Sequence, residues 1–244
     1  MLKINNIRKT FPGGSEPILK GVDLHLSPGE FCIIIGSNGS GKSTLMKSIS
    51  GEYSIDSGEI IIEANAVIAN VTQDINKGTI PEMTLLENMI LSKLLGKNAS
   101  FNFYHQRMAE VSVIVQELGI GLENYIDQPL KHLSGGQRQM IATLMAINSK
   151  PDILLLDEHT SALDPKMQKL LMEYTANLIS KNKITSLMIT HKLDDALRYG
   201  DRLIMLHQGQ IVFDVKSEKK QNLDIDKLLE LFHSYEDSIL RSKS

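Results

Sequence analysis

The sequence predicts an α/β fold in which a mainly parallel sheet is covered by helices. Short apolar runs alternate with helical patterns, and three of these runs, 31–35, 153–156 and 186–190, are each followed by polar residues. Short, wholly apolar strands of this kind are typical of strands buried on both faces. Because ligands in open α/β sheets bind at the carboxyl ends of the strands, the residues after these runs are the first candidates for a functional site.

The N-terminal part predicts an antiparallel layer beside this core. Residues 2–10 and 18–26 have the pattern of two strands, and the turn-rich segment 11–14 joins them. Residues 58–62 and 67–71 are expected to add further strands to the same layer. The whole of 1–244 is expected to form a single domain.

Residues 83–130 are mostly helical in pattern, and a helical subdomain of about 83–150 is expected between strands of the core. Apolar residues recur there at helical spacing, as Leu85, Leu86, Met89 and Ile90 and again as Val111, Ile114, Val115 and Leu118. The tail, 222–244, is expected to be an amphipathic helix that packs on the domain, with a partner-binding helix as the less favoured alternative. Its shared apolar face consists of Ile225, Leu228, Leu229 and Phe232.

The composition is that of a globular protein, with 42 % hydrophobic and 23 % charged residues. A net charge of -3 and a pI near 6.2 do not require a nucleic-acid partner, and none is predicted. No apolar stretch approaches the roughly 18–20 residues that span a bilayer, so a cytoplasmic location is expected. The lone Cys32 lies in an apolar run, which favours a buried thiol and a reducing compartment.

A phosphate-binding loop follows the first buried strand. The pattern G-x-x-x-x-G-K-[ST] is matched by Gly36, Ser37, Asn38, Gly39, Ser40, Gly41, Lys42, Ser43 and Thr44. Its glycines let backbone N–H groups close around phosphate oxygens, and the helix that follows adds a partial positive charge. Lys42 is predicted to reach the β- and γ-phosphates, and Ser43 to bind Mg²⁺. By itself the motif indicates nucleotide binding without specifying the machine.

Two acids, Asp157 and Glu158, end the second buried run. A buried carboxylate needs a metal ion or hydrogen bonds to offset its desolvation, so Asp157 is predicted to bind Mg²⁺ directly or through water. Successive side chains on a strand point in different directions. Glu158 is therefore predicted to orient or deprotonate the water that attacks the γ-phosphate.

A second anion site is predicted where the segment 133–137, Leu-Ser-Gly-Gly-Gln, opens a helical stretch. Its residues Ser134, Gly135, Gly136 and Gln137 combine a hydroxyl with two glycines at a helix start. One ATP cannot easily use both cradles of one chain if they are far apart. A head-to-tail pair, in which each chain completes the site of the other, is the natural arrangement.

These motifs and their order resemble the ABC ATPases, over about residues 2–215. The family's signature is matched by residues 133–137, and its aspartate loop by residues 161–164. The resemblance implies a P-loop NTPase core with an antiparallel β-subdomain and an inserted helical subdomain, and an ATPase that uses ATP and Mg²⁺. By position, Gln73 is similar to the glutamine that contacts Mg²⁺ and the attacking water, and Asp164 to the aspartate at the dimer seam. His191 is similar to the switch histidine that holds the γ-phosphate, and Phe11 to the aromatic residue that stacks on adenine.

The resemblance also shows two departures. The segment between Glu63 and Gln73 is shorter than in most relatives, which indicates a trimmed antiparallel subdomain. His159 follows Glu158 where many relatives have proline or alanine, and we interpret it as a loop spacer and not as a second catalytic histidine.

The resemblance implies a transporter subunit, most similar to the separate ATPase subunits of bacterial importers. Residues 81–89 resemble the segment beside the groove that receives a short helix of the membrane subunit. Residues 157–166 and 202–205 resemble an importer branch grouped with binding proteins suggested to take tryptophan or tyrosine. The expected partners are a second copy of the chain, integral membrane permease subunits and a substrate-binding protein, with the chain held on the inner face of the membrane by the permease.

Two alternatives stay open at this point. Export of a drug, lipid or lipoprotein would use the same ATPase motifs. A non-transport ABC ATPase acting on ribosomes or DNA is the second alternative. Against it, only about a hundred residues without sustained heptads separate the phosphate loop from the signature, and the chain has one nucleotide domain.

Overall fold

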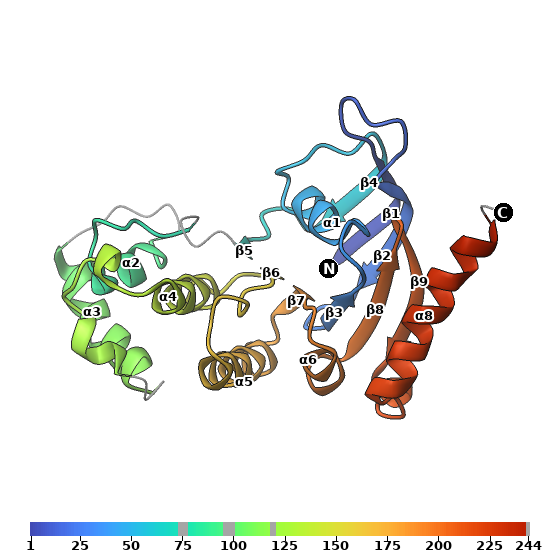
Figure 1. The fold of residues 1–244 in the computed structure, drawn as a ribbon. Coiled ribbons are helices and arrows are strands. Elements are labelled where there is room, and N and C mark those ends of the chain that lie inside the picture. Colours follow the sequence, from blue (N-terminus) through green and yellow to red (C-terminus); the bar gives the residue numbers. More distant parts are fainter. Residues whose placement is uncertain (73–77, 95–100, 118–120, 243–244) are drawn as a thin grey trace. The chain divides into compact units, whose positions relative to one another are not determined.

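The computed structural model describes residues 1–72, 78–94, 101–117 and 121–242 (Figure 1). The chain divides into two compact units. Residues 1–66 together with 183–244 form the first unit, and residues 67–182 form the second. Of the sequence-based predictions, those for Gln73 and Leu118 lie outside the described residues.

The antiparallel layer of the first unit has three strands, β1 (Leu2–Lys9), β2 (Leu19–Leu26) and β4 (Ser57–Ile62), in the order β2-β1-β4. The predicted hairpin of the first two strands is confirmed. The assignment of 67–71 to this layer was wrong, because β5 (Ile68–Val71) pairs in parallel with β6 (Ile153–Asp157) in the second unit. A four-residue strand carries too little pattern to specify its partner, and here the partner is set by tertiary contacts.

The parallel sheet of the first unit is built around β3 (Phe31–Ile35), whose five residues are all buried. β7 (Thr185–Ile189) and β8 (Arg202–His207) pair with β3 in parallel, one on each side. β9 (Gln210–Lys216) continues the sheet as the antiparallel partner of β8. The sequence patterns predicted β3 and β7 but not the β8–β9 hairpin, whose outer strand is only half-buried.

The two sheets of the first unit are joined by the guanidinium group of Arg202. Its Nε and Nη2 donate to the two carboxylate oxygens of Asp214 at 2.7 and 2.6 Å, and its Nη1 donates to the carbonyl oxygen of His25 at 2.7 Å. Arg202 thereby links β8 to β9 and to β2. A bidentate, charge-assisted pair of this kind holds its partners in a defined geometry, and Asp214 raises the pKa of Arg202 above its usual value.

Four helices complete the first unit: α1 (Lys42–Ile49), α6 (Leu193–Arg198), α7 (Ser217–Lys220) and α8 (Ile225–Ser242). The predicted tail helix is confirmed as α8, which runs beside β9 in Figure 1. Leu228 on its apolar face is fully buried, so α8 packs on the unit, whereas Leu229 of the same face is 40 % exposed. The expectation of packing is therefore met by only part of the face.

The second unit is mostly helical around the β5–β6 pair. Within its described residues, the helices are α2 (Leu85–Leu91), α3 (Phe101–Glu117), α4 (Gly135–Asn148) and α5 (Pro165–Asn182), together with the 3-10 turns η1 (Leu122–Tyr125) and η2 (Leu130–His132). The apolar residues that repeat at helical spacing form its core, among them Leu85, Met89, Val111 and Val115. Across the described parts of both units, no helix is long and apolar enough to cross a membrane.

Candidate functional site

Glycines shape the loop that connects β3 to α1. Gly36, Gly39 and Gly41 have φ angles of 151°, 78° and 104°, a range in which residues with a Cβ atom are strained. A Cβ atom at Gly36 would also lie 2.1 Å from the carbonyl oxygen of Leu206 on β8. The loop can therefore take this shape only with glycine at Gly36, which accounts for the first glycine of the motif.

Lys42 places a positive charge inside this loop. It is 6 % exposed, and its Nζ donates to the carbonyl oxygens of Gly36 at 2.8 Å and Ser37 at 2.9 Å. Lys42 is also the first residue of α1, whose N-cap residue Gly41 offers no side-chain acceptor. The N-terminal N–H groups of the helix, its partial positive charge and the ammonium group thus converge on the loop, as a triphosphate requires.

Two hydroxyls of the loop fit the same ligand. Ser43 lies exposed in the first turn of α1, where a hydroxyl can bind a cation that accompanies phosphate. Ser40 is 2 % exposed, and its Oγ has no hydrogen-bond partner among the described residues. A buried hydroxyl of this kind is usually satisfied, so a bound phosphate oxygen or water is the partner that the loop shape offers.

The turn of the β8–β9 hairpin is hydrogen-bonded to the phosphate loop and supports it. The sequence patterns did not predict this role. The N–H of Gly209, in the hairpin turn, donates to the carbonyl oxygen of Ser40 at 2.9 Å, and the carbonyl oxygen of Gly209 accepts from Lys20. A Cβ atom at Gly209 would lie 2.2 Å from the carbonyl oxygen of Ile18, so glycine is required. The available signal was a glycine between two strand-like runs, the usual mark of a hairpin.

Phe11 belongs to a corner of two aromatic rings. Its ring centroid lies 5.1 Å from that of Tyr53, and the ring planes meet at 82°. Lys9 Nζ is 5.7 Å from the Phe11 ring centroid, and Lys47 Nζ is 5.0 Å from that of Tyr53. Tyr53 was not among the predicted site residues, although an aromatic residue just after α1 is a detectable signal. The edge-to-face contact fixes how Phe11 presents its ring.

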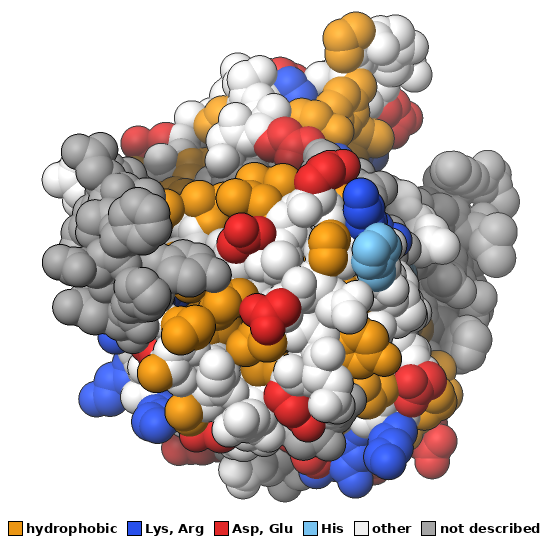
Figure 2. All heavy atoms as spheres, turned by 90° about the vertical axis from the view of Figure 1, so that its left-hand side faces the viewer, with side chains coloured by type: hydrophobic (Ala, Val, Ile, Leu, Met, Phe, Trp, Pro, Cys, Tyr) orange, Lys and Arg blue, Asp and Glu red, His pale blue; other side chains and the backbone are white. Residues whose placement is uncertain are grey.

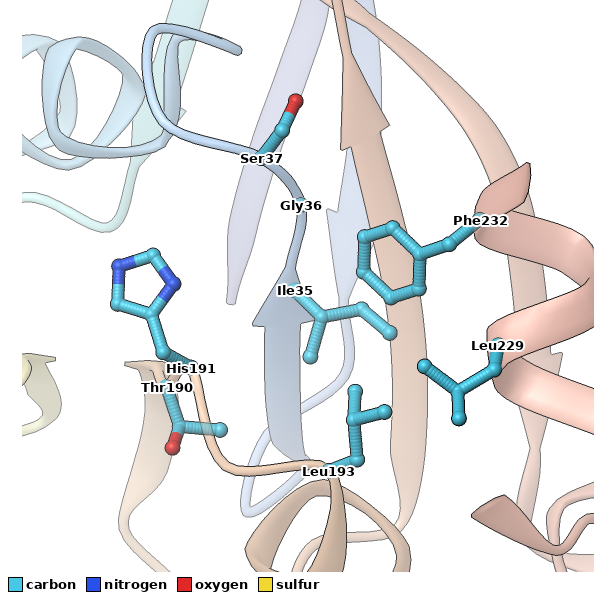
Figure 3. A pocket seen from close by; sticks show the side chains of 8 residues that line it. All are labelled: Ile35, Gly36, Ser37, Thr190, His191, Leu193, Leu229 and Phe232. Carbon is cyan, nitrogen blue, oxygen red and sulfur yellow. The ribbon is translucent and has the colours of Figure 1, made fainter. Parts of the chain in front are cut away.

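His191 follows β7 and lies beside the start of the phosphate loop. Its side chain is exposed, and it lines one pocket together with Gly36 and Ser37 (Figure 3). β7 and β3 are neighbouring parallel strands, so their carboxyl ends bring His191 and the loop to the same edge of the sheet. Phe11, the phosphate loop and His191 therefore all lie in the first unit.

The two acids lie in the second unit, at the carboxyl end of β6. Asp157, its last residue, is half-buried, and Glu158 has a φ of 49°. A non-glycine residue in this left-handed conformation costs about 1 kcal/mol. The turn that follows is closed by the N–H of Ser161, which donates to the carbonyl oxygen of Glu158 at 3.0 Å. The chain therefore turns immediately after Asp157, and Glu158 is the first residue beyond the strand.

His159 is a buried member of this turn. It is 1 % exposed, and its Nε2 atom has no hydrogen-bond partner among the described residues. Burial lowers the pKa of His159 to about 4, which keeps the imidazole neutral at physiological pH. The prediction that His159 is a loop spacer agrees with a side chain that is packed inside the turn.

The segment 133–137 begins α4 with a capping box. Ser134 is the N-cap residue, and its Oγ accepts the N–H of Gln137 at 3.2 Å. In return, the side-chain Oε1 of Gln137 accepts the N–H of Ser134 at 2.9 Å. This reciprocal pair fixes the start of the helix and leaves the hydroxyl hydrogen of Ser134 available for donation outward.

Signature and aspartate loop touch each other within the second unit. A Cβ atom at Gly136 would lie 2.9 Å from Cδ2 of Leu163, so a glycine allows close packing here. Asp164 follows directly and caps α5, because its Oδ1 accepts the N–H groups of Lys166 and Met167 at 3.0 and 3.1 Å. The aspartate loop thus lies against the start of the signature helix.

Gln73 lies outside the described residues, but its neighbour is tied to the helix of the signature. The carbonyl oxygen of Thr72 accepts a hydrogen bond from Nε2 of Gln139 on α4 at 3.3 Å. The predicted site residues are thus divided between the units. Asp157, Glu158, Asp164 and the signature belong to the second unit.

Comparisons with known proteins agree on one family. A family described as ABC transporter matches residues 19–161. A tyrosine transport ATP-binding protein of Clostridioides difficile is 39 % identical over 247 residues, covering 95 % of this chain and 98 % of that protein. A phosphonates import ATP-binding protein, PhnC, of Hydrogenovibrio crunogenus is 30 % identical and covers 88 % of this chain and 83 % of that protein.

Solved structures give the same result for the fold. The ATP-binding cassette MJ0796, in a dimeric post-hydrolysis state bound to ADP and Pi, matches with a TM-score of 0.76 and 31 % identity, covering 89 % of this chain and 99 % of that one. The ADP conformation of the cassette MJ1267 matches with a TM-score of 0.74 and 27 % identity, covering 95 % of this chain. The phosphate loop, the acidic strand end and the capped signature helix are thus found in a chain that belongs to the ABC transporter family as its ATP-binding, ATP-hydrolysing subunit.

Proposed function

We propose that this ATPase drives an importer whose cargo is an aromatic amino acid. The support comes from a nearly full-length relationship to a tyrosine transport ATP-binding protein and from further relatives named for import of phosphonates and of spermidine or putrescine. In an importer the cargo contacts the other subunits. Its identity is therefore inferred here only from the names of the relatives.

The observation that carries the nucleotide site is the buried ammonium group of Lys42 inside a loop of glycines. Lys42 neutralises the β- and γ-phosphates, and the N–H groups of the loop and of α1 surround them. Ser43, Asp157 and Gln73 are the residues that would hold Mg²⁺, which would neutralise charge on the phosphates. Phe11 stacks on the adenine ring.

Glu158 orients and deprotonates the attacking water, and His191 holds the γ-phosphate. The second half of the site comes from a second copy of the chain, arranged head to tail. Ser134 of that copy donates its hydroxyl hydrogen to the γ-phosphate, and Gly136 allows the close approach. ATP binding thereby favours the closed pair, and hydrolysis removes the contact that holds it closed.

The membrane partner is a permease with a short helix that docks on the second unit near α2. The described residues of this unit include large apolar side chains that are more than a third exposed: Ile80, Leu91, Met108, Val113 and Tyr125. Figure 2 shows hydrophobic side chains between acidic ones on the side where α2 and α3 lie. The permease holds the chain at the inner face of the membrane, and a binding protein delivers the cargo.

Two substitutions test the assigned chemistry. Glu158→Gln keeps the shape but removes the base, so it should bind ATP and accumulate a closed dimer with little turnover, measured by size-exclusion chromatography and phosphate release. Lys42→Ala should lose nucleotide affinity in calorimetry. Glu218→Gln, an exposed acid of the first unit, is the matched control. Parental turnover in Glu158→Gln would remove the base assignment, and unchanged affinity in Lys42→Ala would remove that of the lysine.

The transport role is tested by purification from detergent-solubilised membranes of the native host, followed by mass spectrometry. A multi-span permease together with a binding protein supports import, and the binding protein can then be titrated with tyrosine and tryptophan. A permease without a binding protein favours export. Salt-sensitive capture of ribosomes or DNA in place of a permease would support the non-transport alternative.

A further inference from the structure

A pocket of about 320 Å³ lies between the phosphate loop, the segment after β7 and the C-terminal helix. It is lined by Ile35, Gly36, Ser37, Thr190, His191, Leu193, Leu229 and Phe232. In Figure 3, Leu229 and Phe232 reach from α8 toward Ile35 and Leu193, and His191 lies on the other side of Ile35. A helix close to the end of the chain thus shares a wall with the proposed γ-phosphate residue.

Backbone hydrogen bonds hold the start of the segment that carries His191. The N–H of Thr190 donates to the carbonyl oxygen of Ile34 at 3.2 Å, and the N–H of Lys192 donates to Oγ1 of Thr190 at 3.1 Å. α6 begins at Leu193 and its N-cap residue, Lys192, makes no side-chain capping bond. Leu193 is partly buried, so its packing is one of the restraints on the direction of the segment after Thr190.

The opposite wall is anchored independently of this segment. Leu228 of α8 is fully buried. Tyr235 Oη donates to the carbonyl oxygen of Val212 on β9 at 2.7 Å, which fixes α8 one turn beyond the pocket. At its start, Asp224 Oδ1 accepts the N–H of Lys227 at 2.8 Å. α8 is thus held to the first unit by the buried Leu228 before the pocket residues and by Tyr235 after them, and it can serve as a fixed support.

We propose that Leu229 and Phe232 are positioning residues for ATP hydrolysis, because they support Leu193 and so hold the His191 segment at the phosphate loop. This inference rests on the proposed role of His191. The support is incomplete in this structure, since Leu229 is 40 % exposed and the pocket is hollow. The His191 segment is thereby supported by α8 on its apolar side, and the hollow pocket leaves it room to move when the nucleotide binds.

The first test truncates the support and separates turnover from binding. Leu229→Ala and Phe232→Ala should each lower kcat at least about fivefold and change KM for ATP less than twofold, because a displaced γ-phosphate contact affects the chemical step more than nucleotide binding. Phe232→Leu, which keeps an apolar side chain, should restore most of kcat. Ile225→Ala is the matched control, because Ile225 lies on the same helix, is 37 % exposed and does not line the pocket.

The second test asks whether the support acts through His191. In a His191→Ala background, single-turnover hydrolysis should show no further loss when Leu229→Ala is added, because residues that act as a unit are not additive. If the losses in hydrolysis rate caused by His191→Ala and Leu229→Ala multiplied in the double variant, the proposal would be overturned. Equal effects of Leu229→Ala and Ile225→Ala on kcat would overturn it as well. Parental turnover in His191→Ala itself would overturn the role of His191, which is a distinguishable failure.

A spectroscopic readout is available because the chain contains no tryptophan. Phe232→Trp places a single fluorophore on the pocket wall, and its emission should shift when ATP is added, since Gly36 and Ser37 line the same pocket. Ile225→Trp should show no shift. If the emission of Phe232→Trp did not change on addition of ATP although the variant still binds ATP, this would contradict a coupling between α8 and the phosphate loop.

Discussion

His159 predicts a specific pH dependence of stability. Burial lowers its pKa from 6.5 to about 4, so the folded chain binds a proton here less readily than the unfolded chain. A histidine with a lowered pKa contributes no pH dependence to the free energy of unfolding at pH values above its pKa in the unfolded chain. As the pH falls below about 6.5, protonation of the unfolded chain destabilises the fold. The imidazole must stay neutral because its Nε2 atom is buried without a partner among the described residues.

The size of this effect follows from the two pKa values. Their difference corresponds to about 3 kcal/mol once the pH lies below both values, and to about 2 kcal/mol at pH 5. His159→Ala removes the titrating group and leaves a cavity whose cost does not depend on pH. The free energy of unfolding of this variant should therefore fall less than that of the parent chain between pH 8 and pH 5, by about 2 kcal/mol.

The assay is urea unfolding followed by circular dichroism at pH 8, 6.5 and 5. His132→Ala is the matched control, because it removes a histidine whose side chain is exposed and not packed in the core. Parallel profiles for the parent chain and His159→Ala would refute the argument, since they would mean that His159 is protonated in the folded state at little cost.

Three further predictions concern the site and the core. Gly136→Ala should lower ATPase activity about tenfold or more, because a Cβ atom would hinder the close approach to the γ-phosphate that we assign to Gly136. Thermal stability should be nearly unchanged, because the added Cβ atom comes closer than 3 Å only to the movable end of Leu163, 2.9 Å away, and alanine favours a helix. Phe11→Ala should weaken ATP binding in calorimetry without weakening tripolyphosphate binding, and Tyr53→Ala should do the same more mildly, because Tyr53 packs edge-on against Phe11. Cys32 is fully buried, and burial raises the pKa of its thiol, so a thiol reagent should react only at the rate at which the chain opens.

Each of these predictions has an outcome that contradicts it. A large loss of melting temperature in Gly136→Ala would mean that the glycine serves folding. If Phe11→Ala lowered the affinity for ATP and for tripolyphosphate equally, the Phe11 ring would not stack on the adenine base. Rapid labelling of Cys32 in the native chain, at a rate insensitive to urea, would mean that β3 is accessible to solvent.

The sequence by itself predicted the local features with a short-range cause. The three buried runs became strands because their apolar residues fit a sheet interior, and the phosphate loop formed because its glycines tolerate positive φ angles. The capped start of α4 follows from Ser134 and Gln137 at a spacing of three residues. In these cases the cause lies within a few residues of its effect, so it can be seen in the sequence.

The tertiary structure alone decided which segments meet. The sequence placed residues 67–71 in the wrong layer, because four residues are compatible with either pairing and distant contacts choose between them. It did not predict the β8–β9 hairpin, whose turn backs the phosphate loop through Gly209, or the edge-on contact of Tyr53 with Phe11. Nor did it show that Leu229 and His191 line one pocket. These relations depend on contacts between residues far apart in the chain, and a periodic pattern of side chains does not encode which distant surface will cover it.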